Sequence, residues 1–456
     1  MFNIFTVTLT IYLLVFIAIG ILDLKKIKDF NDYSVAGKKQ GLFAVVMTLL
    51  ATVLGASTTI GITDTVYKIG FPGIWWLAFG ALGLIFQSFL LSKKVRDIDA
   101  VTLPDLAGRI VDRKAELLIA LIIVISWIGV VAGQFVAMNS LITFALGGSN
   151  KGVFIIVSLI VIAYTAIGGQ MSVVKTDKLQ LIIIFFGIAA VLIYLFCGIG
   201  DGSGQIFHSI ELLNDDYKTS NLFTQLFVIG GVYFLGPDIL SRNFISRDSK
   251  TAKKSALISG LILLVFSFAI TMVGMWLRFN VSVEEMGEMG ALMYAVSLLP
   301  KPVAVILLFG LLSAILSSTD TCIINASTIF VKDVLKKEKV SYVRVTVILI
   351  GAFALALALL GRGDIMALLT GAYSIYTPGV IFPLMVAIFA FDGEKSGVRT
   401  GIWLLAVVLG GLFGIGGSYF NDLLTKLGMP SFILQYLTLI GMAVSLLVAL
   451  GAIKRR

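Results

Sequence analysis

A run of hydroxyl and carboxyl side chains interrupts an otherwise apolar segment of the sequence, in the stretch AILSSTDTCIINAST at residues 314–328. At about 100° per residue, an α-helix would gather most of these polar groups on one face. That stripe comprises Ala314, Ser317, Ser318, Thr321, Asn325 and Thr328, with Asp320 at its edge. Hydroxyl and carbonyl oxygens are the ligands that small hard cations such as sodium prefer. The stripe therefore predicts a cation site on a helix face that looks into the protein.

Within this stripe, Ser317 and Ser318 are the residues that we expect to bind the ion. Backbone carbonyls of an unwound helix opposite them would complete the site without adding a fixed charge. Any single hydroxyl could instead donate to a carbonyl one turn earlier in its own helix, which is common for Ser and Thr. Several aligned positions beside a carboxylate are harder to explain in that way.

The composition places this segment in a membrane protein. Of 456 residues, 58% are hydrophobic and 13% are charged, and the mean hydropathy is +1.02. Such values are typical of polytopic membrane proteins. Windows of about 20 apolar residues, long enough to cross a bilayer, recur along the chain. We expect thirteen helical spans, at about 4–23, 41–68, 71–92, 115–146, 152–168, 174–199, 222–241, 255–277, 302–331, 345–361, 365–391, 397–417 and 431–452.

Lysine and arginine concentrate on one side of these spans. If the N-terminus lies outside, the segments that fall inside carry 28 of the 35 Lys and Arg residues. Positive residues gather on the cytoplasmic side of membrane proteins. We therefore expect a multi-pass plasma-membrane protein with its N-terminus outside and its C-terminus in the cytoplasm. The net charge of +9 is then explained by these loops rather than by a nucleic-acid surface.

Spans two to six and spans seven to eleven fit two copies of one five-helix unit, inserted in opposite orientations. Secondary transporters with this organisation bind their cargo where the first helix of each copy is broken. Here Gly55 interrupts LLATVLGASTTIGITD, and Gly236 with Pro237 interrupts IGGVYFLGPD. Such residues can free backbone carbonyls for a ligand. Close helix packing by small residues is the alternative for each break.

The expected organisation follows from these units. Residues 1–40 form a leading helix and a basic cytoplasmic loop, and 41–200 form the first inverted repeat. Residues 201–391 form the second repeat, and 392–456 form two trailing helices. The predicted fold class is thus an all-α polytopic membrane protein with thirteen transmembrane helices.

Several short stretches resemble, in the same order, the sodium:solute symporter family, which includes sodium-coupled transporters of proline, sugars, sialic acid and pantothenate. They are DYSVAGKKQG at 32–41, ATVLGASTTIGITDTVYKIG at 51–70, YTAIGGQMSVVKTDKLQ at 164–180, GPDILSRNFIS at 236–246 and AILSSTDTCIINASTIFVKD at 314–333. The resemblance covers nearly the whole chain. It implies a leucine-transporter-type five-plus-five inverted repeat with one leading and two trailing helices.

The resemblance also implies a complete sodium site. Its ligands would be the backbone carbonyls of Ala51, Leu54 and Ala314 and the hydroxyls of Ser317 and Ser318.

A second cation site is a further hypothesis, formed by Asp177, Asp320 and Thr321. In some family members the position of Asp177 lies near an additional cation, although an acid there could simply cap a helix. An unpaired carboxylate at Asp320 would cost about 3 kcal/mol in mid-membrane, so it must be protonated, paired or ion-bound. Alternatively, Asp320 lies near the cytoplasmic end, hydrated or paired with a loop lysine.

The resemblance leaves the solute open. Tyr233 and Pro237 match a motif like that of the proline transporters, but Ser57 stands where those carry a bulky aromatic residue. We therefore expect an amino acid, a sugar or a small carboxylate. The predicted solute pocket consists of Thr58, Thr59, Gln134, Tyr233 and Asp238.

Together these features predict a sodium-coupled secondary active symporter that imports a small polar organic solute by alternating access. A passive channel or facilitator, and a proton-coupled transporter of the same fold, are the alternatives. We expect no enzymatic activity, because the single histidine, His208, lies in a predicted outside loop without a nucleophile partner. The expected partners are the co-transported sodium ion, a small-molecule solute and the lipid bilayer, with the protein acting as a monomer.

Overall fold

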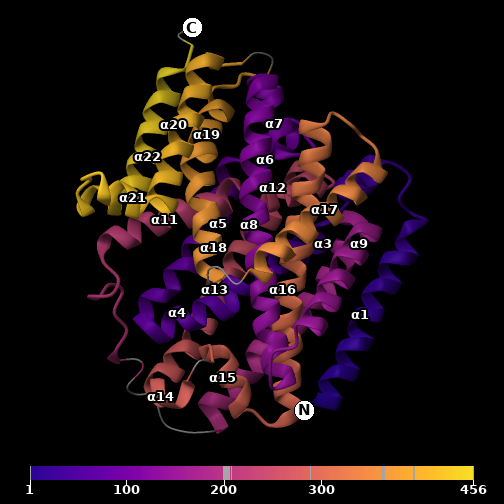
Figure 1. Ribbon diagram of the computed structural model, residues 1–456. Coiled ribbons are helices and arrows are strands. Elements are labelled where there is room, and N and C mark those ends of the chain that lie inside the picture. Colours follow the sequence, from indigo (N-terminus) through magenta and orange to yellow (C-terminus); the bar gives the residue numbers. More distant parts are fainter. Residues whose placement is uncertain are drawn as a thin grey trace.

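The structure, a computed structural model, describes residues 2–198, 206, 208–287, 289–360, 365–393 and 396–454 (Figure 1). Within these ranges every regular element is a helix, and three isolated β-bridges occur without any strand. The predicted all-α class is therefore confirmed for the part of the chain that is described. His208, predicted to lie in a loop, is exposed.

The helices of the first half of the chain are α1 (Phe2–Leu24), α2 (Phe30–Val35), α3 (Leu42–Val53), α4 (Ile62–Ile69), α5 (Trp75–Leu90), α6 (Ser92–Asp97), α7 (Leu103–Ile110), α8 (Arg113–Leu146) and α9 (Lys151–Ile193). Those of the second half are α11 (Thr219–Leu235), α12 (Pro237–Ile245), α13 (Ser249–Asn280), α14 (Val283–Met286), α15 (Ala291–Leu298), α16 (Lys301–Ile329), α17 (Val340–Leu359), α18 (Ile365–Tyr376), α19 (Phe382–Ala390), α20 (Thr400–Tyr419), α21 (Asn421–Lys426) and α22 (Ser431–Gly451). Short 3₁₀ or π turns occur at η1 (Ala36–Lys38), η2 (Ser57–Gly61), η3 (Phe71–Ile74), η4 (Tyr194–Gly198), η5 (Phe330–Val334) and η6 (Thr377–Ile381).

Among the described residues, eleven helices are long and apolar enough to cross a membrane, or twelve if the bent pair Leu42–Val53 and Ser57–Ile69 is one span. The sequence predicted thirteen spans, one more than the twelve counted with the bent pair. The difference lies in α9, because the predicted spans 152–168 and 174–199 form one helical segment there. The backbone of that segment leaves helical geometry at Gly169, with φ 57° and ψ −164°.

Both helix breaks predicted from glycine and proline are present. The segments on either side of residues 54–56 are bent by 62°. The second break separates α11 from α12 at Gly236, whose extended ψ of 148° places Pro237 at the first turn of α12. Because proline lacks an N–H, it is well tolerated at the start of a helix but not in its interior.

Helix α16 occupies the centre of the molecule, where it contacts α3, α8, α9 and α12 (Figure 1). Every residue from Leu307 to Ile329 is buried. The polar stripe therefore does look into the protein, as expected, but the opposite face of the helix is also covered by protein.

The two ends of the bundle differ. Helix α1 begins at one end, and α22 finishes at the other, where α6, α7 and the α16–α17 connection also lie (Figure 1). Ion pairs join these segments: Lys332 Nζ lies 3.2 Å from Asp105 Oδ1, and Lys336 Nζ lies 2.5 Å from Glu116 Oε1. The basic segments predicted to face the cytoplasm thus include several that gather at one end.

One basic residue assigned to those inside segments lies elsewhere. Arg242, which the sequence placed just beyond a span ending at residue 241, is an interior residue of α12 with 0% exposure. The assignment to an inside loop is therefore wrong, because α12 starts at Pro237 and carries the chain for two more turns through the protein.

Glycines allow α5 and α11 to approach closely. A Cβ on Gly83 would lie 2.3 Å from the carbonyl oxygen of Gly230. Since this distance is shorter than any real contact of a Cβ, the helices could not pack in this way with a larger residue.

Replacement of Gly83 by alanine should destabilise the protein by about 1–3 kcal/mol, the usual cost of overpacking. Thermal unfolding of the purified protein in detergent would measure this change. Gly148→Ala is the control, because no atom lies within 4 Å of its added Cβ. Equal melting temperatures for the two variants would contradict the close contact between α5 and α11.

Candidate functional site

The break after α3 redirects two backbone N–H groups. The N–H of Gly55 donates to the carbonyl of Val53 at 2.9 Å, and that of Ala56 donates to Gln134 Oε1 at 3.2 Å. In a continuous helix these groups would bond to the carbonyls of Ala51 and Thr52. The break therefore frees two carbonyls in the middle of the protein.

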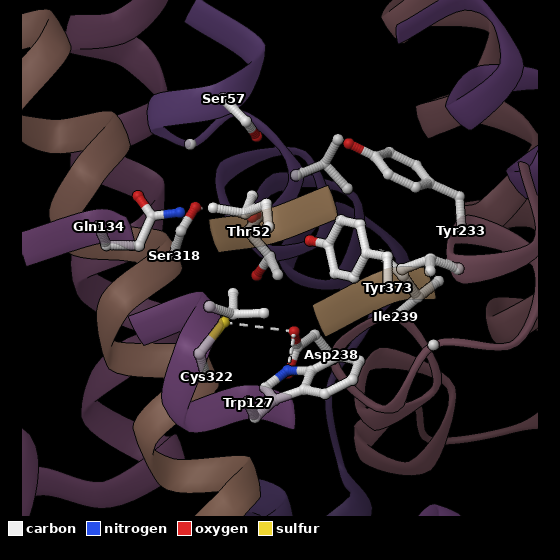
Figure 2. Close-up of a pocket in the computed structure, with 16 residues that line it drawn as sticks. Thr52, Ser57, Trp127, Gln134, Tyr233, Asp238, Ile239, Ser318, Cys322 and Tyr373 are labelled. Atoms are coloured by element: carbon white, nitrogen blue, oxygen red, sulfur yellow. Dashed lines mark hydrogen bonds between the residues drawn. The ribbon is translucent and has the colours of Figure 1, made fainter. Parts of the chain in front are cut away.

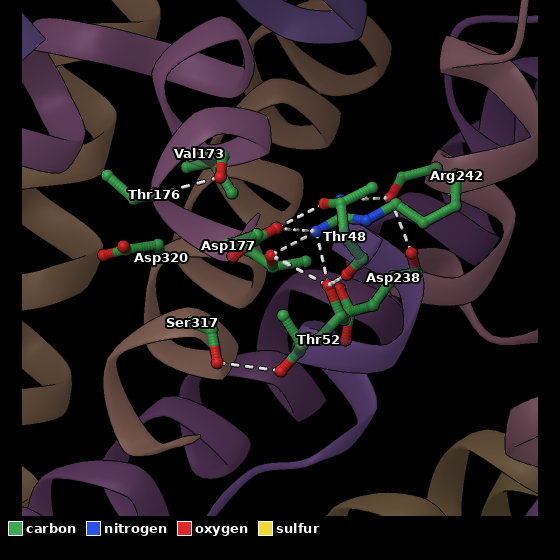
Figure 3. Close-up of polar contacts among 12 residues, drawn as sticks. Thr48, Thr52, Val173, Thr176, Asp177, Asp238, Arg242, Ser317 and Asp320 are labelled. Atoms are coloured by element: carbon green, nitrogen blue, oxygen red, sulfur yellow. Dashed lines mark hydrogen bonds and ion pairs between the residues drawn. The ribbon is translucent and has the colours of Figure 1, made fainter. Parts of the chain in front are cut away.

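Two serines of α16 meet these freed carbonyls. Ser317 Oγ donates to the carbonyl of Ala51 at 2.8 Å and also lies 3.1 Å from the carbonyl of Ala314 (Figure 3). Ser318 Oγ donates to the carbonyl of Thr52 at 2.9 Å. Both hydroxyls could rotate their hydrogens away and present lone pairs to a cation.

Of the five predicted sodium ligands, three are brought together by these contacts: Ala51, Ala314 and Ser317. Ser318 lies beside them and pairs with Thr52. Leu54 lies at the end of α3, where its φ of −81° and ψ of 70° depart from helical geometry. The oxygen-rich arrangement fits sodium, which needs neither thiolate nor imidazole ligands.

Gly55 allows the broken helix to approach α16. A Cβ at this position would lie 2.4 Å from Ser318 Oγ and 3.3 Å from Gln134 Nε2. A larger residue would therefore push into the group of oxygens.

A small cavity of about 40 Å³ lies next to these oxygens, between the two helix breaks (Figure 2). The phenol oxygens of Tyr233 and Tyr373 point toward the side of the cavity formed by Gln134 and Ser318. Its lining residues are Thr52, Val53, Gly55, Ser57, Trp127, Val130, Gln134, Val232, Tyr233, Gly236, Asp238, Ile239, Ser318, Cys322, Leu369 and Tyr373.

Three of the five residues predicted for the solute pocket line this cavity: Gln134, Tyr233 and Asp238. Thr58 and Thr59 are not among the lining residues. Their hydroxyls donate to carbonyls of their own segment, from Thr58 to Val53 at 2.9 Å and from Thr59 to Gly55 at 2.8 Å. Ser57 lines the cavity instead.

Asp238 is held by neutral donors from two helices. Trp127 Nε1 donates to Oδ2 at 2.6 Å, and Asn325 Nδ2 donates to Oδ1 at 2.7 Å. The thiol of Cys322 lies 3.3 Å from Oδ2. Asp238 is also in the first turn of α12, where the positive end of the helix favours an acidic residue.

Arg242, which the sequence analysis did not include in any site, contacts two of the three residues predicted to bind a second cation. Arg242 Nη2 donates to Thr321 Oγ1 at 2.6 Å and lies 3.4 Å from Asp177 Oδ2 (Figure 3). Asp177 also accepts a hydrogen bond from Thr48. It lies within α9 and does not cap a helix.

Asp320 lies apart from this pair. Its carboxylate points away from Arg242 (Figure 3) and accepts hydrogen bonds from Tyr164 at 2.7 Å and from Thr165 at 2.6 Å. Asp320 is fully buried, so the alternative of a hydrated residue near the cytoplasmic end is wrong.

Trp127, Cys322 and Tyr373 were also absent from the sequence-based set. Trp127 and Tyr373 lie in apolar segments, and Cys322 lies inside the polar stretch 314–328. Each is of a type that is ordinary for a helix core, so the residue type alone gives no signal of a site. Arg242 did leave a signal. It follows Asp238 by four residues in GPDILSRNFIS, and a helix starting at Pro237 would place both side chains on one face.

Comparison with known proteins identifies the family of the chain. The profile of the sodium:solute symporter family matches residues 33–404. The osmoregulated proline transporter OpuE of Bacillus subtilis is 26% identical over 411 residues, which cover 83% of this chain and 83% of that protein. The sodium/pantothenate symporter of Haemophilus influenzae is 27% identical over 443 residues, which cover 89% of this chain and 86% of that protein.

The fold is similar to that of a solved Na+-coupled sialic acid symporter in a substrate-bound outward-open state. The TM-score is 0.79, with 18% sequence identity and 99% of each chain covered. At this identity the likeness establishes a shared fold. The family consists of membrane transporters rather than enzymes, and sodium is their co-transported ion. From its match over most of its length, the chain belongs to the sodium:solute symporter family.

Proposed function

We propose that this symporter imports a small polar organic solute by alternating access, driven by sodium that binds between α3 and α16. The observation that supports this most directly is the pairing of Ser317 and Ser318 with the carbonyls of Ala51 and Thr52. A broken helix and a hydroxyl-bearing helix here converge on a group of oxygens without a fixed charge. The proposed sodium ligands are Ala51, Leu54, Ala314, Ser317 and Ser318.

Sodium supplies enough free energy for accumulation of the solute. One positive charge that moves down a membrane potential of 100 mV releases about 2.3 kcal/mol, before its concentration gradient is counted. Ser318 lies both in the oxygen group and in the cavity lining, so sodium binding would alter the wall of the cavity directly. This shared residue gives a physical basis for coupling.

We assign the solute to the cavity between the two breaks. Gln134, Tyr233 and Asp238 supply polar groups, as expected from the sequence, and Ser57 supplies a hydroxyl. We assign Thr58 and Thr59 to the support of the broken helix, since their hydroxyls bond to its carbonyls. The mixed polar and apolar lining suits a small polar organic solute such as an amino acid, a sugar or a small carboxylate.

The proposed topology has thirteen spans, with the N-terminus outside, the C-terminus in the cytoplasm and a five-plus-five inverted repeat. A straight α9 of 43 residues would be about 65 Å long, roughly twice the hydrocarbon core. We therefore count α9 as two spans that meet at Gly169. An odd number of spans agrees with the positions of the start of α1 and the end of α22 at opposite ends of the bundle (Figure 1). We propose that the monomer is the working unit.

Ser317→Ala and Ser318→Ala should each raise the sodium concentration for half-maximal uptake by about tenfold or more. A lost interaction with a charged partner typically costs roughly 1.5–3 kcal/mol. The measurement is uptake into proteoliposomes, with the solute first identified from labelled amino acids, sugars and small carboxylates. Thr319→Ala is the matched control, because its hydroxyl donates to the carbonyl of Ile315 in its own helix at 2.6 Å.

The same vesicles separate the proposed function from its two alternatives. Uptake against a concentration gradient that stops when the sodium gradient is dissipated supports sodium symport. Persistence of uptake without sodium, together with its loss on collapse of a proton gradient, would identify a proton-coupled transporter. Uptake that never exceeds equilibrium would identify a facilitator.

Cysteine substitution should distinguish the cavity wall from the helix interior. In a background with Cys197→Ser and Cys322→Ser, we expect Ser57→Cys to react with a small thiol reagent and to be protected by the transported solute. Thr58→Cys should react slowly, with no protection, because residue 58 is turned into its own helix. The reverse pattern would place Thr58 in the solute pocket.

The orientation can be tested in the same cysteine-free background with a membrane-impermeant thiol reagent on intact cells. Asp215→Cys, an exposed position before α11, should be labelled from outside. Lys337→Cys, an exposed position between α16 and α17, should be labelled only after the cells have been permeabilised. Labelling of Lys337→Cys in intact cells would invert the proposed topology.

A further inference from the structure

One wall of the cavity between the two helix breaks carries a negative charge. Among the described residues that line this cavity, Asp238 is the only one with a formal charge. It keeps part of its surface accessible, whereas Asp177 and Asp320 are both 0% exposed. Asp238 is therefore the core carboxylate that a solute in the cavity can reach.

The contacts of Asp238 fit an ionised carboxylate. Its Oδ2 accepts from Trp127 Nε1 and lies near the Cys322 thiol, and its Oδ1 accepts from Asn325 Nδ2. Donors directed at both oxygens favour the charged form, which accepts hydrogen bonds and donates none. Because these three donors are uncharged, they stabilise the carboxylate without neutralising it.

Arg242 neutralises Asp238 only in part. The two side chains attract each other from positions one turn apart on α12. However, Arg242 Nη2 is directed at two threonine hydroxyls and at Asp177, whose Oδ2 is 3.4 Å away (Figure 3). One guanidinium thus serves two carboxylates, and it is not among the groups that line the cavity. Part of the negative charge of Asp238 remains uncompensated.

The group of oxygens proposed to bind sodium lies on a different side of the cavity. Ser318 and Gln134 lie together on one side, whereas Asp238, Trp127 and Cys322 are grouped on another (Figure 2). Sodium bound near Ser318 would thus leave the Asp238 side to the solute. An indole ring and a thiol do not suit a small hard cation, which prefers oxygen ligands.

Aromatic rings beside a carboxylate are suited to an organic cation. Trp127, Tyr233 and Tyr373 line the cavity together with Asp238, and the ring centroids of Trp127 and Tyr373 are 6.2 Å apart. Ammonium groups are attracted to the faces of such rings as well as to carboxylates. A sugar offers no positive charge to this wall, and a solute that is only a carboxylate would be repelled by Asp238.

We propose that the solute carries a positively charged nitrogen, and that Asp238 binds this nitrogen beside the ring of Trp127. This inference rests on the proposed function and narrows its solute. Of the three solute classes it keeps amino acids, extends to other amines, and excludes sugars and carboxylates that lack an amino group. The bound cation would also complete the neutralisation of Asp238, which favours retention of the solute while the cavity is closed.

The charge on this wall can be measured before the solute is known. Ser57→Cys, in the background with Cys197→Ser and Cys322→Ser, places a thiol in the cavity lining. Its rate constants are measured without sodium for a cationic reagent, aminoethyl methanethiosulfonate, and an anionic one, sulfonatoethyl methanethiosulfonate. In each reaction the thiolate forms a mixed disulfide and methanesulfinate leaves. The intrinsic reactivity of the thiol therefore cancels in the ratio of the cationic to the anionic rate.

The ratio should be at least tenfold higher at Ser57→Cys than at Asp215→Cys, an exposed position outside the cavity. Asp238→Asn should lower the ratio at Ser57→Cys by about tenfold or more, and Asp238→Glu should preserve it. Unit charges roughly 10 Å apart in a protein interact strongly enough for such a change. Asp248→Asn is the matched control, because Asp248 is exposed at the start of α13 and asparagine caps a helix equally well.

Equal ratios at Ser57→Cys and Asp215→Cys would overturn the proposal. An unchanged ratio at Ser57→Cys in a folded Asp238→Asn protein would do so as well, with folding judged by size-exclusion profiles. If Asp238→Asn yields no folded protein, the comparison of the two thiol positions with Asp238 in place decides.

Transport separates failure of this proposal from failure of the proposed function. In proteoliposomes with a sodium gradient, we expect accumulation of a labelled amine or amino acid and none of labelled sugars or amine-free carboxylates. Sodium-driven accumulation of a sugar or an amine-free carboxylate would overturn the role of Asp238 and leave sodium symport intact. Accumulation of an amine that ignores the sodium gradient would instead remove the proposed coupling and retain the role of Asp238.

Discussion

The need to satisfy every backbone polar group inside a bilayer controls the architecture of this symporter, because lipid offers no hydrogen bonds to a broken helix. Each break is covered by side chains from other helices. At the first, Ser317 and Ser318 reach the carbonyls of Ala51 and Thr52. At the second, the Tyr376 hydroxyl donates to the carbonyl of Leu235 at 2.6 Å, and Gln87 Nε2 donates to that of Phe234 at 3.1 Å. The positions of α5, α16 and α18 around the breaks follow from this requirement.

The two breaks are covered by different chemistry, and the difference bears on their roles. A serine hydroxyl can turn its hydrogen from a carbonyl and offer a lone pair to an ion, so the first break can exchange a hydrogen bond for a sodium contact. The tyrosine and glutamine at the second break act as donors to carbonyls and hold it in shape. The cavity lies between them, with Ser318 on one side and Tyr233 on the other (Figure 2). An ion at the first break and a solute in the cavity would thus favour the same arrangement of α16.

The features that could be predicted from the sequence were those that violate the rules of an apolar helix. Gly55 and Pro237 marked the breaks, and the hydroxyls near Ser317 marked the polar face of α16. The break at Gly169 was predicted only as a gap between spans, because the local pattern does not reveal a residue with positive φ. Thr58 resembled a ligand in the sequence but bonds to its own segment. Which hydroxyl turns inward depends on the local winding of η2, and that winding depends on distant helices.

The partners of the buried carboxylates could not be predicted from local sequence patterns. Asp177 lies against a guanidinium, whereas Asp238 and Asp320 are held by neutral donors. Asp238 can rely on the positive end of α12, but Asp320 lies in the middle of α16 and depends on hydroxyls of α9. Asp177 and Arg242 are separated by 65 residues in sequence. Their pairing exists because α12 continues through the protein after Pro237 instead of giving way to a loop, so the residues that follow the second break place Arg242 in the interior.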